Sequence, residues 1–161
     1  MLTTHNSLPL PVREVIVTLL NARLADAVDL TTHAKQAHWT VRGANFIALH
    51  QLFDSVHTDA EEWMDLIAER VAQLGGQALG TAAVATEKSN LPRYPLNISD
   101  GPAQIEALSA SLTAFGKLVR AAIDEAAEKG DAATADIFTE IQRGIDKQLW
   151  FVEAHAYARN G

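Results

Sequence analysis

Four side chains able to bind a metal recur at helical spacing in the second quarter of the sequence. Counted from His50 at 100° per residue, Asp54 falls at about 40° and Asp65 at about 60° around a helix. Glu69 falls at about 100°, so the four side chains share one helix face. Imidazole and carboxylate groups are ligands for divalent transition metals. The chain has no cysteine, so disulfides and thiolate metal sites are excluded.

These donors form two pairs that are too far apart to bind the same ion. Asp54 and Asp65 are separated by 11 residues, or about 16 Å along a helix. If the helix pairs antiparallel with a second copy about a two-fold axis near residues 59 and 60, position i faces position 119 − i. His50 then meets Glu69 of the partner subunit, and Asp54 meets Asp65 of the partner subunit. A symmetric dimer would hold two equivalent shared sites.

His38 can join this donor set if the turn formed by "RGAN" folds it back over His50. Two imidazoles and three carboxylates with open positions suit Fe(II), and zinc or manganese fits the same donors. A zinc that only stabilises the interface is a further interpretation. The simplest alternative is a solvated helix face, since charges at i, i+4 spacing are common on exposed helices. The conjunction of these donors favours a metal site.

The apolar side chains of the same segment lie on a different face, centred near about −90° on the same scale. They are Leu49, Phe53, Val56, Ala60, Met64, Ile67, Val71 and Leu74. This face should pack into the core of the chain, so the metal-binding face should point away from it.

Two long helices are expected in the first half of the chain. The first should run from Pro11, in its first turn, to about Trp39. Asn45 should be the N-cap of the second, which continues to the glycines at 75 and 76.

The second half should contain two more long helices. Residues 77–99 have weak periodicity and two prolines, which favours a long crossover with at most a short helix. Asp100 or Ser99 should cap the third long helix, which ends near Lys129, and Asp131 should open the fourth. This order predicts an all-α four-helix bundle with one crossover, as in ferritin-like folds.

The length of 161 residues is typical of a single domain, here expected over residues 1–161, with 1–10 as a short flexible tail. The opening "MLTTHNSLPLP" lacks the pattern of a signal peptide, and no segment approaches the roughly 20 apolar residues that span a bilayer. A soluble, cytoplasmic protein is expected, with no membrane partner. The net charge of −7 suits cations better than phosphate backbones or anionic lipid.

Two stretches resemble the signatures of the Dps family, the mini-ferritins: "HWTVRGANFIALHQLFD" at 38–54 and "MDLIAERVAQLGGQA" at 64–78. The similarity extends to "TADIF" at 134–138 and "DKQLWF" at 146–151. It implies a ferritin-like four-helix bundle with a short helix in the crossover, assembled as a hollow homododecamer from two-fold dimers.

The resemblance also implies a ferroxidase centre at the two-fold interface. His38, His50 and Asp54 match ligands from one subunit, and Asp65 and Glu69 match ligands from the other. The family oxidises Fe(II) to Fe(III), usually with hydrogen peroxide rather than dioxygen, and stores ferric mineral in the cavity. Zinc would compete for the same ligands, no organic cofactor is needed, and removing iron and peroxide together would protect DNA.

In the family, acidic residues near the loop before the fourth long helix line the pores through which iron enters the shell. Asp136 in "TAD" is the best match to these residues, and Asp131 is a second candidate for which helix capping is the alternative.

Family members that bind DNA use basic tails, but here the first basic residue is Arg13 and the C-terminal "AHAYARNG" offers only Arg159. Twelve chains at −7 each would carry −84. We therefore expect weak or absent DNA binding. The alternative function is a DNA-binding protein that compacts the nucleoid and whose metal site is secondary.

Several other side chains carry structural predictions. Trp63 and Trp150 are expected in the core, and Trp39 either over the metal centre or in an interface. His33 should face away from the site, because it lies about 140° around the helix from His38. His57 lies near the proposed two-fold axis and would face Glu62 of the partner subunit.

Overall fold

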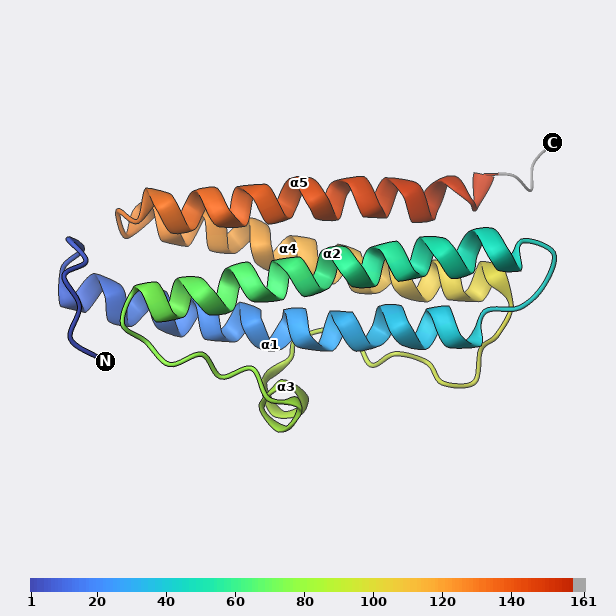
Figure 1. The fold of residues 1–161 in the computed structure, drawn as a ribbon. Helices are drawn as coiled ribbons and strands as arrows, with labels where there is room; N and C mark the ends of the chain where they lie inside the picture. The colour runs from blue at the N-terminus through green and yellow to red at the C-terminus, as the bar shows by residue number, and fades with distance from the viewer. Residues whose placement is uncertain (158–161) are drawn as a thin grey trace.

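The computed structural model describes residues 1–157, which contain four long helices and one short helix (Figure 1). They are α1 (Leu10–Thr40), α2 (Phe46–Gln73), α3 (Ala82–Lys88), α4 (Gly101–Glu128) and α5 (Ala132–Ala154). The predicted all-α fold is confirmed, including the short helix in the crossover. Arg159 lies outside the described residues.

The helix boundaries follow from local capping chemistry. Gly75 has φ +81°, a conformation that side chains other than glycine rarely adopt, and it directly follows the C-cap of α2. The Asp100 carboxylate accepts a hydrogen bond from the Ala103 N–H at 3.0 Å, so Asp100 rather than Ser99 caps α4. Asn45 is the N-cap of α2, but its side chain makes no capping hydrogen bond.

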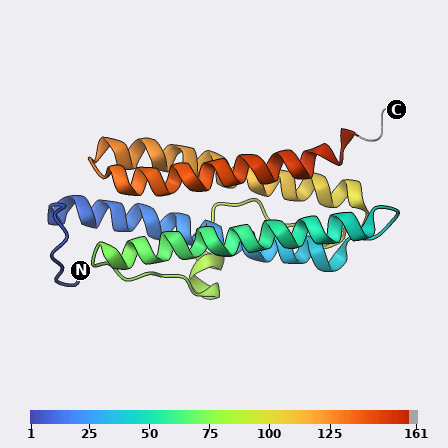
Figure 2. The ribbon, with the colours of Figure 1, turned by 45° about the horizontal axis from the view of Figure 1, so that its top comes forward.

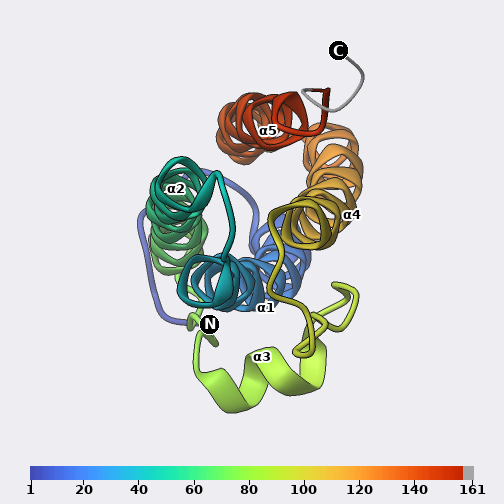
Figure 3. The ribbon, with the colours of Figure 1, turned by 90° about the vertical axis from the view of Figure 1, so that its right-hand side faces the viewer.

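The helices form two hairpins that pack as two layers, α1 with α2 and α4 with α5 (Figure 2). Viewed along the helices, the four surround a common core, and α3 lies outside them against α1 (Figure 3). The crossover that contains α3 therefore connects the two hairpins without entering the bundle. No helix in the described residues is long and apolar enough to cross a membrane.

The core contains the apolar face of α2 that the sequence predicted. Its fully or nearly fully buried members are Leu49, Phe53, Val56, Ala60, Ile67, Val71 and Leu74, and Met64 is partly buried. Trp63 is also in the core, at 5% exposure.

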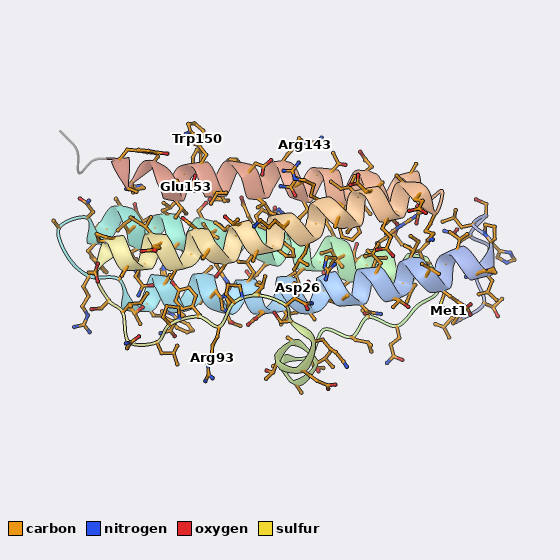
Figure 4. The ribbon with its side chains drawn as sticks, turned by 180° about the vertical axis from the view of Figure 1, so that it is seen from behind. Met1, Asp26, Arg93, Arg143, Trp150 and Glu153 are labelled. Carbon is orange, nitrogen blue, oxygen red and sulfur yellow. The ribbon has the colours of Figure 1, made fainter. Side chains whose placement is uncertain are left out.

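The prediction that Trp150 is a core residue is wrong. Its side chain is 65% exposed and points outward from α5 (Figure 4). The buried positions Gln148 and Val152 lie two residues to either side, which places Trp150 about 200° from Gln148 around the helix. Apolar character alone predicted burial, whereas helical periodicity places this residue on the outer face.

The N-terminal segment lies beside the end of α2. The N–H of Leu2 donates to the carbonyl oxygen of Gly75 at 2.7 Å. The guanidinium of Arg13 donates to the carbonyl oxygens of Leu8 and Leu74 at 3.1 and 3.0 Å. Arg13 thus binds an otherwise unpaired carbonyl at the C-terminus of α2. Flexibility of residues 1–10 stays a prediction.

Candidate metal centre

The rings of His38 and His50 are stacked, with centroids 3.6 Å apart and planes 22° from parallel. His38 Nδ1 lies 2.7 Å from the carbonyl oxygen of His50, and His50 Nδ1 lies 2.8 Å from the carbonyl oxygen of His38. A carbonyl oxygen only accepts hydrogen bonds, so each Nδ1 carries the proton. In the neutral ring each Nε2 then keeps a lone pair that a metal can bind, as is usual for metal-binding histidines.

The turn between α1 and α2 creates this arrangement. Gly43 has φ +110°, and Val41 is extended and almost completely buried. The N–H of Arg42 donates to the carbonyl oxygen of Ser99 at 2.8 Å, which anchors the turn to the crossover. As predicted, the turn returns the end of α1 to the start of α2 and so places His38 against His50.

Asp54 lies one helical turn after His50, and its Oδ1 is 3.9 Å from His38 Nδ1. The ammonium group of Lys35 forms an ion pair with the same oxygen. The hydrogen bond that Lys35 donates within this ion pair is the main cause that holds the pKa of Asp54 below its usual value. His38, His50 and Asp54 therefore lie together in one subunit, with the carboxylate ionised and about half exposed.

Asp65 and Glu69 are exposed on α2, as expected for a face turned away from the core. Within residues 1–157 of one chain, no group of three or more potential metal ligands is assembled closely enough to hold an ion. The pairing of Asp65 and Glu69 with the histidines of a second subunit stays a prediction.

Next to Glu69, Arg70 joins α2 to the start of α5. Its guanidinium lies 2.9 Å from Asp131 Oδ1 and donates to Thr134 Oγ1 at 2.9 Å, and all three residues are buried. Asp131 also accepts a hydrogen bond from the N–H of Thr134, which confirms the capping alternative for this residue. The pore prediction then depends on Asp136, which is exposed on α5 and is not tested by the structure.

Sequence reasoning missed Lys35, which pairs with Asp54, and it missed Arg70 and Arg13, which hold the C-terminal end of α2. Lys35 carried one signal, because it precedes His38 by three residues and so lies on nearly the same side of the helix. His33 faces away from the centre, as predicted, and bonds to Ser111 Oγ at 3.0 Å. Trp39 is 69% exposed, and a role over the centre stays a prediction.

Comparison with known proteins places this arrangement in a family. The ferritin-like domain family matches residues 17–158. The chain is 41% identical over 157 residues to the DNA protection during starvation protein of Agrobacterium fabrum, covering 98% of this chain and 97% of that protein. The chain belongs to the Dps family. The corresponding protein of Brevibacillus brevis is 33% identical over 146 residues, covering 89% of this Dps chain and 95% of that protein.

Solved Dps structures have the same fold. Dps from Microbacterium arborescens in the high iron form matches with a TM-score of 0.86 and 33% identity, covering 98% of this Dps chain and 99% of that one. DpsC from Streptomyces coelicolor matches with a TM-score of 0.90 and 32% identity, covering 96% and 90% of the two chains. The ferritin-like bundle is therefore confirmed over nearly the whole chain.

Proposed function

We propose that this Dps chain forms a shell that oxidises Fe(II) and stores it as ferric mineral, thereby limiting oxidative damage to DNA. The observation that carries the proposal is the stacked pair of His38 and His50. Within residues 1–157 neither Nε2 has a hydrogen-bond partner, and the Asp54 carboxylate lies beside the ring of His38. Iron is the substrate of this centre.

The remaining ligands are Asp65 and Glu69 of the partner subunit. Both side chains are exposed on the helix face that carries His50 and Asp54. Antiparallel pairing about residues 59 and 60 places the two pairs opposite each other, which supports a shared centre. Each two-fold dimer would contain two centres, and twelve chains would form the hollow shell.

The donor set suits iron oxidation. Carboxylates reduce the net charge of bound iron and so favour Fe(III), while open coordination positions admit the oxidant. Hydrogen peroxide accepts one electron from each of two Fe(II) ions, its O–O bond breaks, and two protons complete two water molecules. Dioxygen would be the less effective oxidant. Because Fe(II) and peroxide together generate hydroxyl radicals, consuming both protects DNA.

The relatives support this assignment through what their names state. The protein of Agrobacterium fabrum is named for DNA protection during starvation, and the Dps of Microbacterium arborescens was solved in a high iron form. The activity, the dodecamer and the cytoplasmic location are proposals for the present chain. Zinc should compete with iron, since imidazole and carboxylate bind both.

Protection without tight DNA binding is part of the proposal. The first basic residue, Arg13, is 9% exposed and its guanidinium is bound to two carbonyl oxygens within the chain. A shell with −84 formal charges repels phosphate, so contact with DNA should be weak even at low salt. Nucleoid compaction is therefore the less favoured function.

The test replaces Asp65 and Glu69 by Asn and Gln, which keep their size but remove their charge. We expect at least a tenfold slower oxidation of Fe(II) by peroxide, with assembly retained on a sizing column. Glu153→Gln, at an exposed residue of α5, is the control. An unchanged oxidation rate in this variant would contradict the assignment of Asp65 and Glu69 to the ferroxidase centre. Loss of assembly would instead support a structural metal.

A further inference from the structure

His57 on α2 is prepared for metal binding in the same way as His38 and His50, although it is outside the proposed ferroxidase centre. Its Nδ1 lies 3.1 Å from the carbonyl oxygen of Thr31 on α1. Because that oxygen only accepts, Nδ1 carries a proton, and in the neutral ring Nε2 keeps a lone pair. The α1–α2 hairpin thus presents a third imidazole whose Nδ1 is held by a backbone carbonyl.

A carboxylate lies at ligand distance from this nitrogen. His57 Nε2 is 3.4 Å from Glu61 Oε2. This separation is longer than the usual N–H···O range of about 2.7–3.2 Å. It matches two ligands of one tetrahedral ion, which lie about 3.4 Å apart when each metal–ligand bond is about 2.1 Å. The separation therefore fits two ligands of one ion as well as a long ion pair.

In the isolated chain this pair is exposed to solvent. The side chain of Glu61 is 56% exposed, and that of His57 is 17% exposed. His57 also lines a depression of about 370 Å³ together with Lys35 and Trp39. The surface at His57 is therefore open beside α1.

The dimer proposed above would supply a third ligand. In the register that pairs position i with 119 − i, His57 faces Glu62 of the partner subunit. Glu62 is exposed on α2 and makes no ion pair within the described residues of its own chain. One imidazole and two carboxylates leave a fourth tetrahedral position for water.

We propose that His57 and Glu61, completed by Glu62 of the partner subunit, bind a divalent transition metal ion such as Zn²⁺ or Fe²⁺ near the two-fold axis. Along α2, His57 lies about 10 Å from His50 and about 5 Å from Asp54, so the site adjoins the ferroxidase centre and uses different ligands. It rests on the antiparallel dimer of the proposed function. Each dimer would hold two such ions between its two ferroxidase centres.

The experiment titrates the metal-free, assembled protein with Co²⁺, whose visible absorption is strong only in tetrahedral sites. The Asp65→Asn, Glu69→Gln protein, in which the ferroxidase centre is disabled, should still bind one tetrahedral Co²⁺ per subunit. Adding Glu61→Gln should remove that ion, and adding the control Glu153→Gln should not. His57→Gln is a second variant and should also remove it.

Two results would overturn the whole site, and a third would overturn the part that the partner subunit plays in it. The first is absence of tetrahedral Co²⁺ from the Asp65→Asn, Glu69→Gln protein. The second is the same Co²⁺ stoichiometry with and without Glu61→Gln, as expected if His57 and Glu61 form only an ion pair. Loss of the ion in Glu61→Gln but not in Glu62→Gln would overturn the contribution of the partner subunit.

Failure of this site and failure of the proposed function give different results. Iron oxidation should persist in Glu61→Gln and be lost in the Asp65→Asn, Glu69→Gln protein. If Co²⁺ binding behaves as expected but the Asp65→Asn, Glu69→Gln protein oxidises iron at the wild-type rate, the ferroxidase assignment fails and the His57 site stands.

Discussion

The imidazoles of His38 and His50 bind each other's backbone carbonyl groups while their rings stack 3.6 Å apart. This reciprocal arrangement fixes the tautomer and the orientation of both rings without any third residue. The two Nε2 atoms are therefore positioned before a metal arrives, which reduces the ordering cost of binding.

The Gly43→Ala substitution tests the turn on which this arrangement depends. Gly43 has φ +110°, and a Cβ there would contact nothing within 4 Å, so any cost comes from the backbone. We expect a loss of about 1–3 kcal/mol in stability and slower iron oxidation. Gly80→Ala is the control, because its φ is ordinary and its Cβ would make normal contacts with Leu24. Thermal unfolding and initial rates equal to wild type would contradict the role of the turn.

The Lys35→Gln substitution should strengthen metal binding at the centre. The ammonium group of Lys35 neutralises Asp54, so its removal leaves the full carboxylate charge for the ion. An ion pair at the protein surface contributes up to about 1 kcal/mol, which predicts a two- to fivefold lower Kd for Co²⁺. Lys88→Gln, which breaks an exposed pair with Glu87, should leave the Kd unchanged. Weaker binding in Lys35→Gln would show that Lys35 instead positions the ligand.

The buried His33 should make the fold sensitive to acid. Burial lowers the pKa of His33 below its ordinary value of 6.5, partly opposed by Asp29. The unfolded chain then binds more protons, so stability is full above about pH 6.5 and falls as the pH decreases towards the folded-state pKa. Each unit of pKa difference corresponds to about 1.4 kcal/mol. The thermal midpoint of His33→Gln should depend less on pH between about 7.5 and 5.5; equal slopes would contradict this.

The buried pair of Arg70 and Asp131 should be strongly coupled. Arg70→Ala leaves a buried carboxylate without its partner, so we expect a loss of about 3–5 kcal/mol. The double variant with Asp131→Ala should lose much less than the sum of the two single effects. Chemical unfolding measures all three, with the exposed Arg143→Ala as the control. Additive losses would rule out the coupling.

The helix boundaries and the metal-binding face could be predicted because both depend on local chemistry. Asp100 and Asp131 cap helices through hydrogen bonds to residues three positions later. His50 and Asp54 share a face because they are four residues apart on one helix.

The residues that fix the site could not be predicted, because their partners are distant in sequence. Lys35 and Asp54 are 19 residues apart, and Arg70 and Asp131 are 61 residues apart. The sequence contains many carboxylates with which Lys35 or Arg70 could pair. Only the packing of the helices selects one of them. The ligands from the partner subunit also require a second copy of the chain.

The most direct measurement adds Fe(II) to the metal-free protein without oxygen, then adds hydrogen peroxide, and follows iron on a sizing column. We predict iron in large excess over subunits, eluting with protein at about 209 kDa, which is twelve times 17.4 kDa. Iron that precipitates as it does in buffer alone, while the protein elutes without it, would contradict an iron-storing shell.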